Sequence, residues 1–314
     1  MYHPYFRGKQ FDLLAIKESA EILSRSNFTP IIEPVRESLT GLKRAIEAVS
    51  CAGGNAVLIV NPYHGDYNEN ASAIRKFVLE ELKNHTNIYI GVLLTQDLTI
   101  KNVQEICDGY SDRPIYFIHS GFSEARELAE ATQDRYNTVR HVFNDKDCSI
   151  PYRRHFKDYQ RILLKDGFNR QANRKYPEVE LFSDLHVTFQ ELQYNGFGDF
   201  LIVGDDYSES GGPAYAVAIH LTFLDPDMDA VMYTQHFKSD RHDSPADLPG
   251  KFLEALNKLV AEVTNPNTKI LRTDAVEEFM SLHERKHFPG LGYIKKLSMK
   301  HHIQLLSSFL GSRT

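Results

Sequence analysis

The feature that most constrains the fold is a regular alternation of short apolar runs with helical patterns over the first two thirds of the chain. The runs are mostly continuous stretches of apolar residues, as expected of strands buried on both faces of a parallel sheet. The candidate strands are residues 2–6, 28–32, 56–60, 88–94, 115–118, 139–143, 161–164 and 200–203. Eight strands that alternate with helices favour a closed (β/α)8 TIM-like barrel, with an open doubly wound sheet as the alternative.

The segments between the runs carry apolar residues at helical spacing. Leu42, Ala45, Ile46 and Val49 fall at i, i+3, i+4 and i+7, and comparable stripes lie within 74–82 and 103–110. Each helix is expected to pack this stripe on the sheet.

The pattern changes after Gly204. Two β-rich runs, 214–223 and 231–237, flank a polar turn with proline and predict an antiparallel hairpin. Helical stripes follow at 252–263 and 293–310. We therefore expect a barrel over residues 1–206, with a hairpin and C-terminal helices over 207–314 packed on it.

Charge and cysteine content exclude several classes of protein. The formal net charge of −6 argues against a globally basic nucleic-acid binder. The three cysteines, Cys51, Cys107 and Cys148, form no CxxC pair, so neither a disulfide framework nor a structural zinc site is expected. The start of the chain has no apolar signal core, and no apolar run approaches the roughly 20 residues that span a bilayer. We expect a cytoplasmic protein that does not enter membranes.

Residues that follow the strands of a barrel gather at one rim, where active sites lie. Six polar side chains are the candidate catalytic residues at this rim: Glu33, Asn61, His119, Asp145, Asp166 and Asp205. Arg7, Lys9 and Lys165 are the candidates for binding an anionic part of a substrate. If the six converge on one pocket, replacing Glu33 with Ala should abolish function and barely alter folding. The alternative is that these residues merely end their strands.

The chemistry of such a pocket stays open at the level of sequence. Its carboxylates and imidazole could hold a divalent metal, or could act as general acid and base without one. Walker A, HExxH and GxSxG motifs are absent from the sequence. The Gly-Phe-Gly-Asp-Phe stretch at 196–200 precedes a predicted strand, so we expect a tight turn there. His220 and His236 interrupt the apolar runs of the hairpin, where a histidine is more often a core or rim residue than a ligand.

The final helix carries a candidate partner-binding face. Lys295, Lys296 and Lys300 concentrate positive charge in a chain whose net charge is negative. This face could dock nucleic acid or an acidic partner, or it could simply be solvated.

An ordered set of motifs resembles the bacterial and phage beta-family proteins. The motifs include TPIIEPV, VNPYHG, FIHSGF, LLKDGF, GFGDFLIVGDDY and PGLGYIKKLSMKHHI, and the likeness extends from Tyr2 to about Leu310. It resembles in particular a branch that is often encoded beside a small nuclease-like gene. The resemblance implies a barrel fold and a context of mobile elements and phage defence, but it supplies no mechanism.

Two functions follow as expectations, and the sequence leaves open whether the protein is an enzyme. In the first, the protein is a component of a phage-defence or mobile-element locus. It would work with the nuclease-like partner as a ligand or nucleic-acid sensor, or as a scaffold. In the second, the protein is a barrel hydrolase or lyase that acts on an anionic, phosphorylated small molecule.

Overall fold

The chain forms two compact units, each made of two separate segments. The computed structural model describes residues 1–110, 112–135, 138–209 and 212–312. The first unit comprises Met1–Asp166 and Thr188–Asp199, and the second comprises Gly167–Val187 and Phe200–Thr314. The chain therefore leaves the first unit after β7, returns to it for the last barrel strand, and leaves again.

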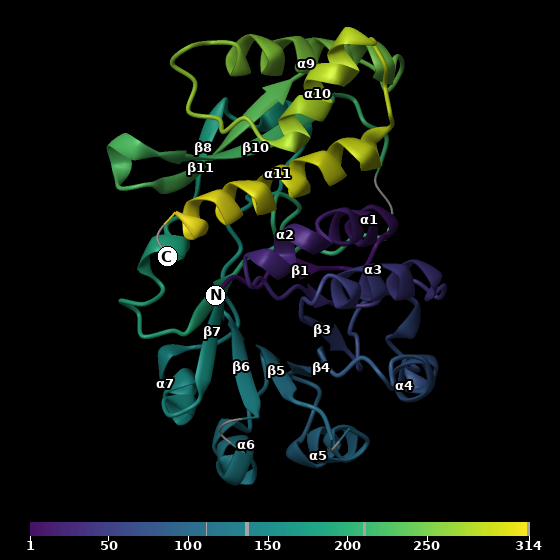
Figure 1. The fold of residues 1–314 in the computed structure, drawn as a ribbon, viewed down its shortest axis with the longest axis vertical. Helices are drawn as coiled ribbons and strands as arrows, with labels where there is room; N and C mark the ends of the chain where they lie inside the picture. Colours follow the sequence, from purple (N-terminus) through teal and green to yellow (C-terminus); the bar gives the residue numbers. More distant parts are fainter. Residues whose placement is uncertain (111, 136–137, 210–211, 313–314) are drawn as a thin grey trace. The chain divides into compact units, whose positions relative to one another are not determined.

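The first unit is a barrel of eight parallel strands (Figure 1). The strands, in order around the barrel, are β1 (Tyr5–Phe6), β2 (Ile31–Ile32), β3 (Ala56–Ile59), β4 (Ile88–Thr95), β5 (Ile115–Ser120), β6 (Val139–Asn144), β7 (Gln160–Leu164) and β9 (Gly196–Gly198). Main-chain bonds join the first and last strands: His3 N donates to Phe197 O at 2.8 Å, and Tyr5 N donates to Asp199 O at 2.9 Å. The predicted (β/α)8 architecture is confirmed.

Helices surround these strands in Figure 1. They are α1 (Gln10–Glu18), α2 (Ala20–Arg25), α3 (Thr40–Cys51), α4 (Ser72–Lys76) with a π-helical turn at Phe77–Glu81, α5 (Ile100–Asp108), α6 (Ala125–Ala131) and α7 (Ile150–Arg153). The stripe expected on α3 is confirmed, because Leu42, Ala45, Ile46 and Val49 are all buried.

The eighth barrel strand lies earlier in the chain than the sequence indicated. Residues 201–203 form a turn, and the strand is β9, within the glycine-rich stretch expected to be a turn. A Cβ atom on Gly198 would lie 2.3 Å from the carbonyl oxygen of His3, and one on Gly196 would lie 2.7 Å from that of Met1. The expectation failed because glycine is a poor strand former in general, whereas here only glycine lets the closing strands approach each other.

The second unit contains an antiparallel sheet and three longer helices. The strands lie in the order β10 (Ala218–Asp225), β11 (Val231–Lys238) and β8 (Val179–Ser183). The helices are α9 (Leu248–Val263), α10 (Asp274–Glu284) and α11 (Leu291–Gly311), while the short α8 (Leu185–Thr188) follows β8. The expected hairpin is confirmed as β10–β11, but β8 and α10 were not anticipated from the sequence.

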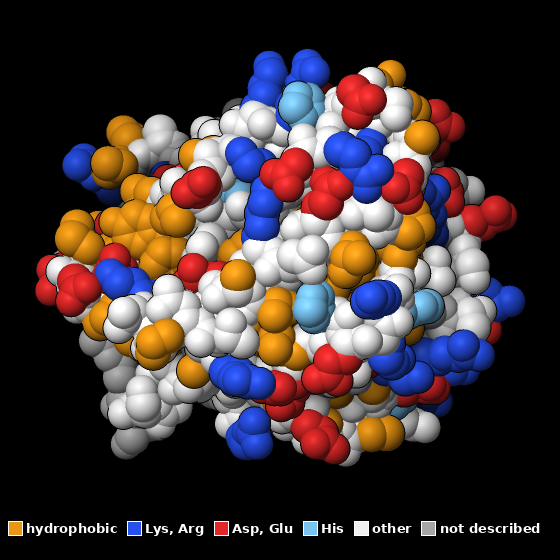
Figure 2. All heavy atoms as spheres, turned by 90° about the horizontal axis from the view of Figure 1, so that it is seen from above, with side chains coloured by type: hydrophobic (Ala, Val, Ile, Leu, Met, Phe, Trp, Pro, Cys, Tyr) orange, Lys and Arg blue, Asp and Glu red, His pale blue; other side chains and the backbone are white. Residues whose placement is uncertain are grey.

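The two faces of this sheet differ in polarity. Ile219 and Leu221 pack into an apolar core with Phe252 of α9 and Phe279 of α10. Residues at alternate positions point to the opposite face, which therefore carries His220, Thr222, Thr234 and His236. The edge strand β8 leaves Val179 and Leu181 exposed, and Figure 2 shows hydrophobic side chains gathered at the left, on the side of the β10–β11 turn.

None of the helices in the described parts of the chain is both long enough and apolar enough to cross a membrane.

Candidate functional site

Glu33, the first of the predicted rim residues, is completely buried and fully hydrogen bonded. One carboxylate oxygen accepts from the Tyr5 hydroxyl at 2.8 Å and from Arg7 Nη1. The other accepts from the main-chain N–H groups of Tyr63 and His64, and it lies 3.0 Å from His64 Nδ1. Glu33 thus ties the end of β1 to the loop that follows β3.

These contacts keep Glu33 ionised. Burial alone would raise its pKa, but the hydrogen bond from His64, the charges of Arg7 and His64 and the hydroxyl of Tyr5 together lower the pKa from 4.5 to about 2. Arg7 is itself nearly buried, with 11% of its side chain exposed. Burial and pairing of Glu33 argue against the expectation that Glu33→Ala would barely alter folding, because the substitution would leave the Arg7 charge unpaired in the protein interior.

Asn61 and Asp145 each hold a neighbouring segment in place. Asn61 Nδ2 donates to the carbonyl oxygen of Leu93 and its Oδ1 accepts from Leu93 N, both at 2.9 Å, so the amide continues the ladder beyond the end of β3. Asp145 Oδ1 accepts from Arg153 Nη2 at 2.6 Å, and that guanidinium also donates to the main-chain oxygen of Asp145.

His119 lies in an aromatic cluster. Its Nε2 is 2.9 Å from His141 Nδ1, and its Nδ1 is 2.6 Å from the Tyr152 hydroxyl. The rings of Phe143 and Phe156 pack on it at 4.5 and 4.9 Å between centroids. Burial and the neighbouring His141 hold the pKa of His119 well below its usual range. The contacts of His119 are thus those of a packed core residue, and its expected catalytic role stays a prediction.

The remaining rim candidates fall in both units. Lys9, Lys165 and Asp166 belong to the first unit and are partly exposed. Asp205 belongs to the second unit and is 8% exposed. Convergence of the six carboxylate, amide and imidazole groups on one pocket stays a prediction. Among the described residues, no three His, Cys, Asp or Glu side chains come together in a way that could hold a metal ion.

The three lysines of α11 do not share one exposed face. Lys295 is exposed, but Lys296 is 2% exposed, and its ammonium lies 3.7 Å from the centre of the Tyr293 ring. Lys300 Nζ lies 3.8 Å from a carboxylate oxygen of Glu278. The expected basic face is wrong in this respect, because the helix turns Lys296 inward and pairs Lys300 with an acid.

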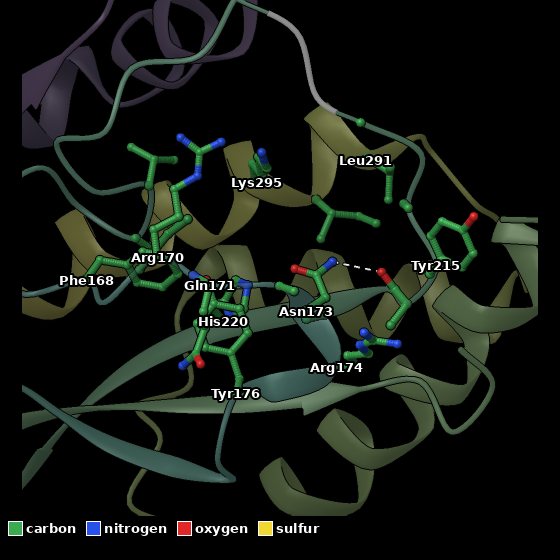
Figure 3. A pocket seen from close by; sticks show the side chains of 18 of the residues that line it. Phe168, Arg170, Gln171, Asn173, Arg174, Tyr176, Tyr215, His220, Leu291 and Lys295 are labelled. Carbon is green, nitrogen blue, oxygen red and sulfur yellow. Dashed lines mark hydrogen bonds between the residues drawn. The ribbon is translucent and has the colours of Figure 1, made fainter. Parts of the chain in front are cut away.

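The second unit contains a pocket of about 550 Å³ that the strand-end reasoning missed (Figure 3). Its walls come from the segment before β8, from the start of β10 and from the first turns of α11. The cationic side chains that line it are Arg170, Arg174 and Lys295. Neither Asp nor Glu occurs among the described lining residues.

Polar and aromatic groups complete the lining. Gln171 and Asn173 contribute amides, and Asn173 Nδ2 fixes the opposite wall by donating to the carbonyl oxygen of Ala216 at 2.8 Å. The rings of Phe168, Tyr176 and Tyr215 supply apolar surface. One signal in the sequence could have indicated this site: residues 168–176 combine two arginines and three amides between two aromatic residues.

A hydrogen-bonded row of side chains leads from the pocket into the sheet. His220 lines the pocket and lies directly opposite His236 in the β10–β11 register, and their Nδ1 atoms are 2.7 Å apart. His236 Nε2 lies 3.0 Å from Glu180 Oε1 on β8. Burial lowers the pKa of His236 to about 4 and holds that of His220 well below its usual range, so both imidazoles are neutral at pH 7.

Comparisons with known proteins add no functional information. No protein-family model matches the sequence, and no curated protein matches it. A solved structure of a morphinone reductase mutant in complex with tetrahydroNAD aligns with 63% of this chain and 82% of its own, at 13% sequence identity and a TM-score of 0.39. A likeness this weak says nothing about the activity of this chain.

Proposed function

We propose that the protein binds a small organic anion, of the phosphorylated class, in the pocket of its second unit. The observation that carries this proposal is the charge of the lining: Arg170, Arg174 and Lys295 face a cavity to which no described acidic side chain contributes. Arginine and lysine are the side chains that bind phosphate oxygens most strongly, and arginine can do so with two parallel hydrogen bonds.

The size and surface of the pocket fit such a ligand. A volume of about 550 Å³ lies within the range of roughly 300–1,000 Å³ that is typical of small-molecule sites. The aromatic rings that line it offer surfaces on which a planar part of the ligand can stack. We therefore expect an anion that carries a ring, such as a nucleotide, to bind more tightly than inorganic phosphate.

The proposal is compatible with both functions expected from the sequence. A sensor that acts with a nuclease-like partner in a defence locus needs a ligand site, and so does a hydrolase or lyase that acts on a phosphorylated substrate. The lysines of α11 give little support to a nucleic-acid surface, since only Lys295 of the three is exposed. The pocket favours a small ligand in either case.

Calorimetric titration with pyrophosphate and with AMP tests the proposal. We expect binding that weakens as salt rises, because screening reduces the attraction between charges. Replacing Arg174 and Lys295 with Gln should each weaken binding roughly tenfold or more, the effect of losing one hydrogen bond to a charged group. Arg272→Gln is the matched control, since Arg272 is exposed and pairs with Glu277 outside the pocket.

Failure of both anions to bind the wild-type protein at millimolar concentration would refute the proposal. Equal weakening by the control variant would do so as well, because binding would then depend on positive side chains anywhere on the surface and not on those of the pocket.

A further inference from the structure

The row Glu180–His236–His220 has a direction that hydrogen-bond chemistry determines. A carboxylate only accepts, so His236 must donate to Glu180 through its Nε2–H. A neutral imidazole carries a single N–H, so His236 Nδ1 is then an acceptor. The N–H of His220 must therefore be on Nδ1, which donates to His236 at 2.7 Å.

This order leaves His220 Nε2 without a proton. That atom makes no hydrogen bond with the described residues, and His220 is a lining residue of the cationic pocket. An unprotonated imidazole nitrogen beside a ligand site is the usual form of a general base. In many active sites a carboxylate fixes the tautomer of a catalytic histidine, and Glu180 is placed to do so here through His236.

We propose that His220 is the general base of the pocket and that His236 and Glu180 are positioning residues that fix its tautomer. The proposal rests on the proposed function for the class of its substrate, an anionic phosphorylated molecule. His220 would remove the proton from a hydroxyl group or water molecule beside the anion. The O–H bond breaks, its electron pair stays on the oxygen as the nucleophile, and the proton forms a bond to Nε2.

The row can share the charge that this step creates. When Nε2 gains a proton, the proton on Nδ1 can move to His236, whose Nε2 proton can move to Glu180. One positive charge enters the row and Glu180 becomes the neutral acid, so no charge needs to remain on a buried ring. Burial raises the pKa of Glu180, which favours its acceptance of a proton.

The surroundings of His220 keep it unprotonated before substrate binds. Burial is the main cause of its lowered pKa, followed by the electrostatic effect of the neighbouring His236 ring and the charge of Lys295. Tyr176 packs on both imidazoles, with ring centroids 4.8 Å from His220 and 4.5 Å from His236. The charge of Lys238 likewise lowers the pKa of His236. An anion among the lining cations would offset the effect of Lys295 and make proton uptake easier.

Side-chain nitrogen NMR at pH 7 tests the order of protons. We expect the proton of His220 on Nδ1 and that of His236 on Nε2. Glu180→Gln should remove this order, because an amide can donate as well as accept, and both rings should then populate two tautomers. Glu178→Gln, two residues away and exposed, is the matched control and should leave the spectra unchanged. A proton on Nε2 of His220 in the wild type would overturn the proposal.

Acylation by diethyl pyrocarbonate, followed by peptide mapping, tests the reactivity of the same atom. His220 should keep its reactivity as the pH falls below about 6.5, where an ordinary histidine loses it. Pyrophosphate should protect His220 but not His242, which is exposed on a loop. His236→Phe should slow the reaction of His220, with its folding checked by circular dichroism. An unreactive His220 in the wild type contradicts the role of base.

These experiments can refute the anion site and the general base His220 independently of each other. If pyrophosphate and AMP do not bind but the tautomers are as expected, the proposed ligand is wrong and the row stands. If they bind while His220 carries its proton on Nε2, the base is wrong and the anion site stands.

Discussion

Removing the charge of Glu33 should destabilise the barrel strongly, contrary to what its position at a strand end suggests. The substitution Glu33→Gln keeps the shape of the side chain but replaces one acceptor oxygen with a donor. That donor would face the N–H groups of Tyr63 and His64 or the guanidinium of Arg7, all of which now donate to the carboxylate. The side chain of Glu33 is 0% exposed, so water cannot compensate for the loss.

The magnitude follows from the pKa. Lowering the pKa of Glu33 from 4.5 to about 2 corresponds to about 3 kcal/mol of folding free energy, at 1.36 kcal/mol for each pH unit. Because the folded-state pKa is the lower one, this stabilisation is present above pH 4.5 and disappears as the pH falls towards 2. Breaking a buried ion pair costs about 3–5 kcal/mol in other proteins, which agrees with this value.

Urea unfolding followed by circular dichroism measures the effect. We expect Glu33→Gln to lower the unfolding free energy by about 3 kcal/mol at pH 7, with a smaller difference from the wild type at pH 3. Glu80→Gln is the control, since its carboxylate is 63% exposed and pairs with Lys76 on the surface, and it should cost less than about 0.5 kcal/mol. A loss below about 1 kcal/mol for Glu33→Gln at pH 7, or one that does not change with pH, would refute the reasoning.

Three further outcomes can be checked by the same unfolding measurement. Gly198→Ala should prevent normal closure of the barrel and cost several kcal/mol, whereas Gly311→Ala, with open space around its Cβ position, should cost almost nothing. Asn61→Asp should cost about 1–3 kcal/mol, because it loses the donor to Leu93 O and buries part of a charge, while anion binding in the other unit stays unchanged. Lys296→Gln should destabilise the second unit by about 1–2 kcal/mol through loss of its contact with Tyr293, and Lys295→Gln should be nearly neutral for stability.

The barrel could be predicted because its signal is local, whereas the roles of the rim residues depend on distant partners. Continuous apolar runs identified seven of the eight strands, and the eighth was displaced because a glycine-rich strand has no apolar signature. The sequence placed Glu33 and Asn61 correctly at strand ends. It could not show that their partners, His64 and Leu93, lie 31 and 32 residues further along the chain. These partners show what Glu33 and Asn61 hold in place, while their expected catalytic role stays a prediction.

The pocket was missed for a related reason. Its cations come from the connection between β7 and β8, several residues beyond the end of β7, and from a helix about 120 residues later. His220 and His236 were noticed because they interrupt apolar runs. Their pairing needed the register of the hairpin, and the carboxylate that orders them lies on β8, a short strand whose alternating sequence gave little signal.

The insertion of β8, a strand of the second unit, within the sequence of the barrel limits how the protein can be divided. β8 belongs to the sheet of the second unit, yet it is encoded between β7 and β9 of the barrel. A single cut anywhere between β7 and β10 therefore damages one unit or the other: before β8 it takes β9 from the barrel, and after β8 it takes an edge strand from the sheet. The carboxylate Glu180 would leave with that strand. During synthesis, the barrel also has to wait for residue 199 before its first strand finds its last partner, and by then β8 has already been made. Neither unit can be inherited, expressed or lost as one continuous piece of sequence, so the two are expected to behave as a single unit of evolution.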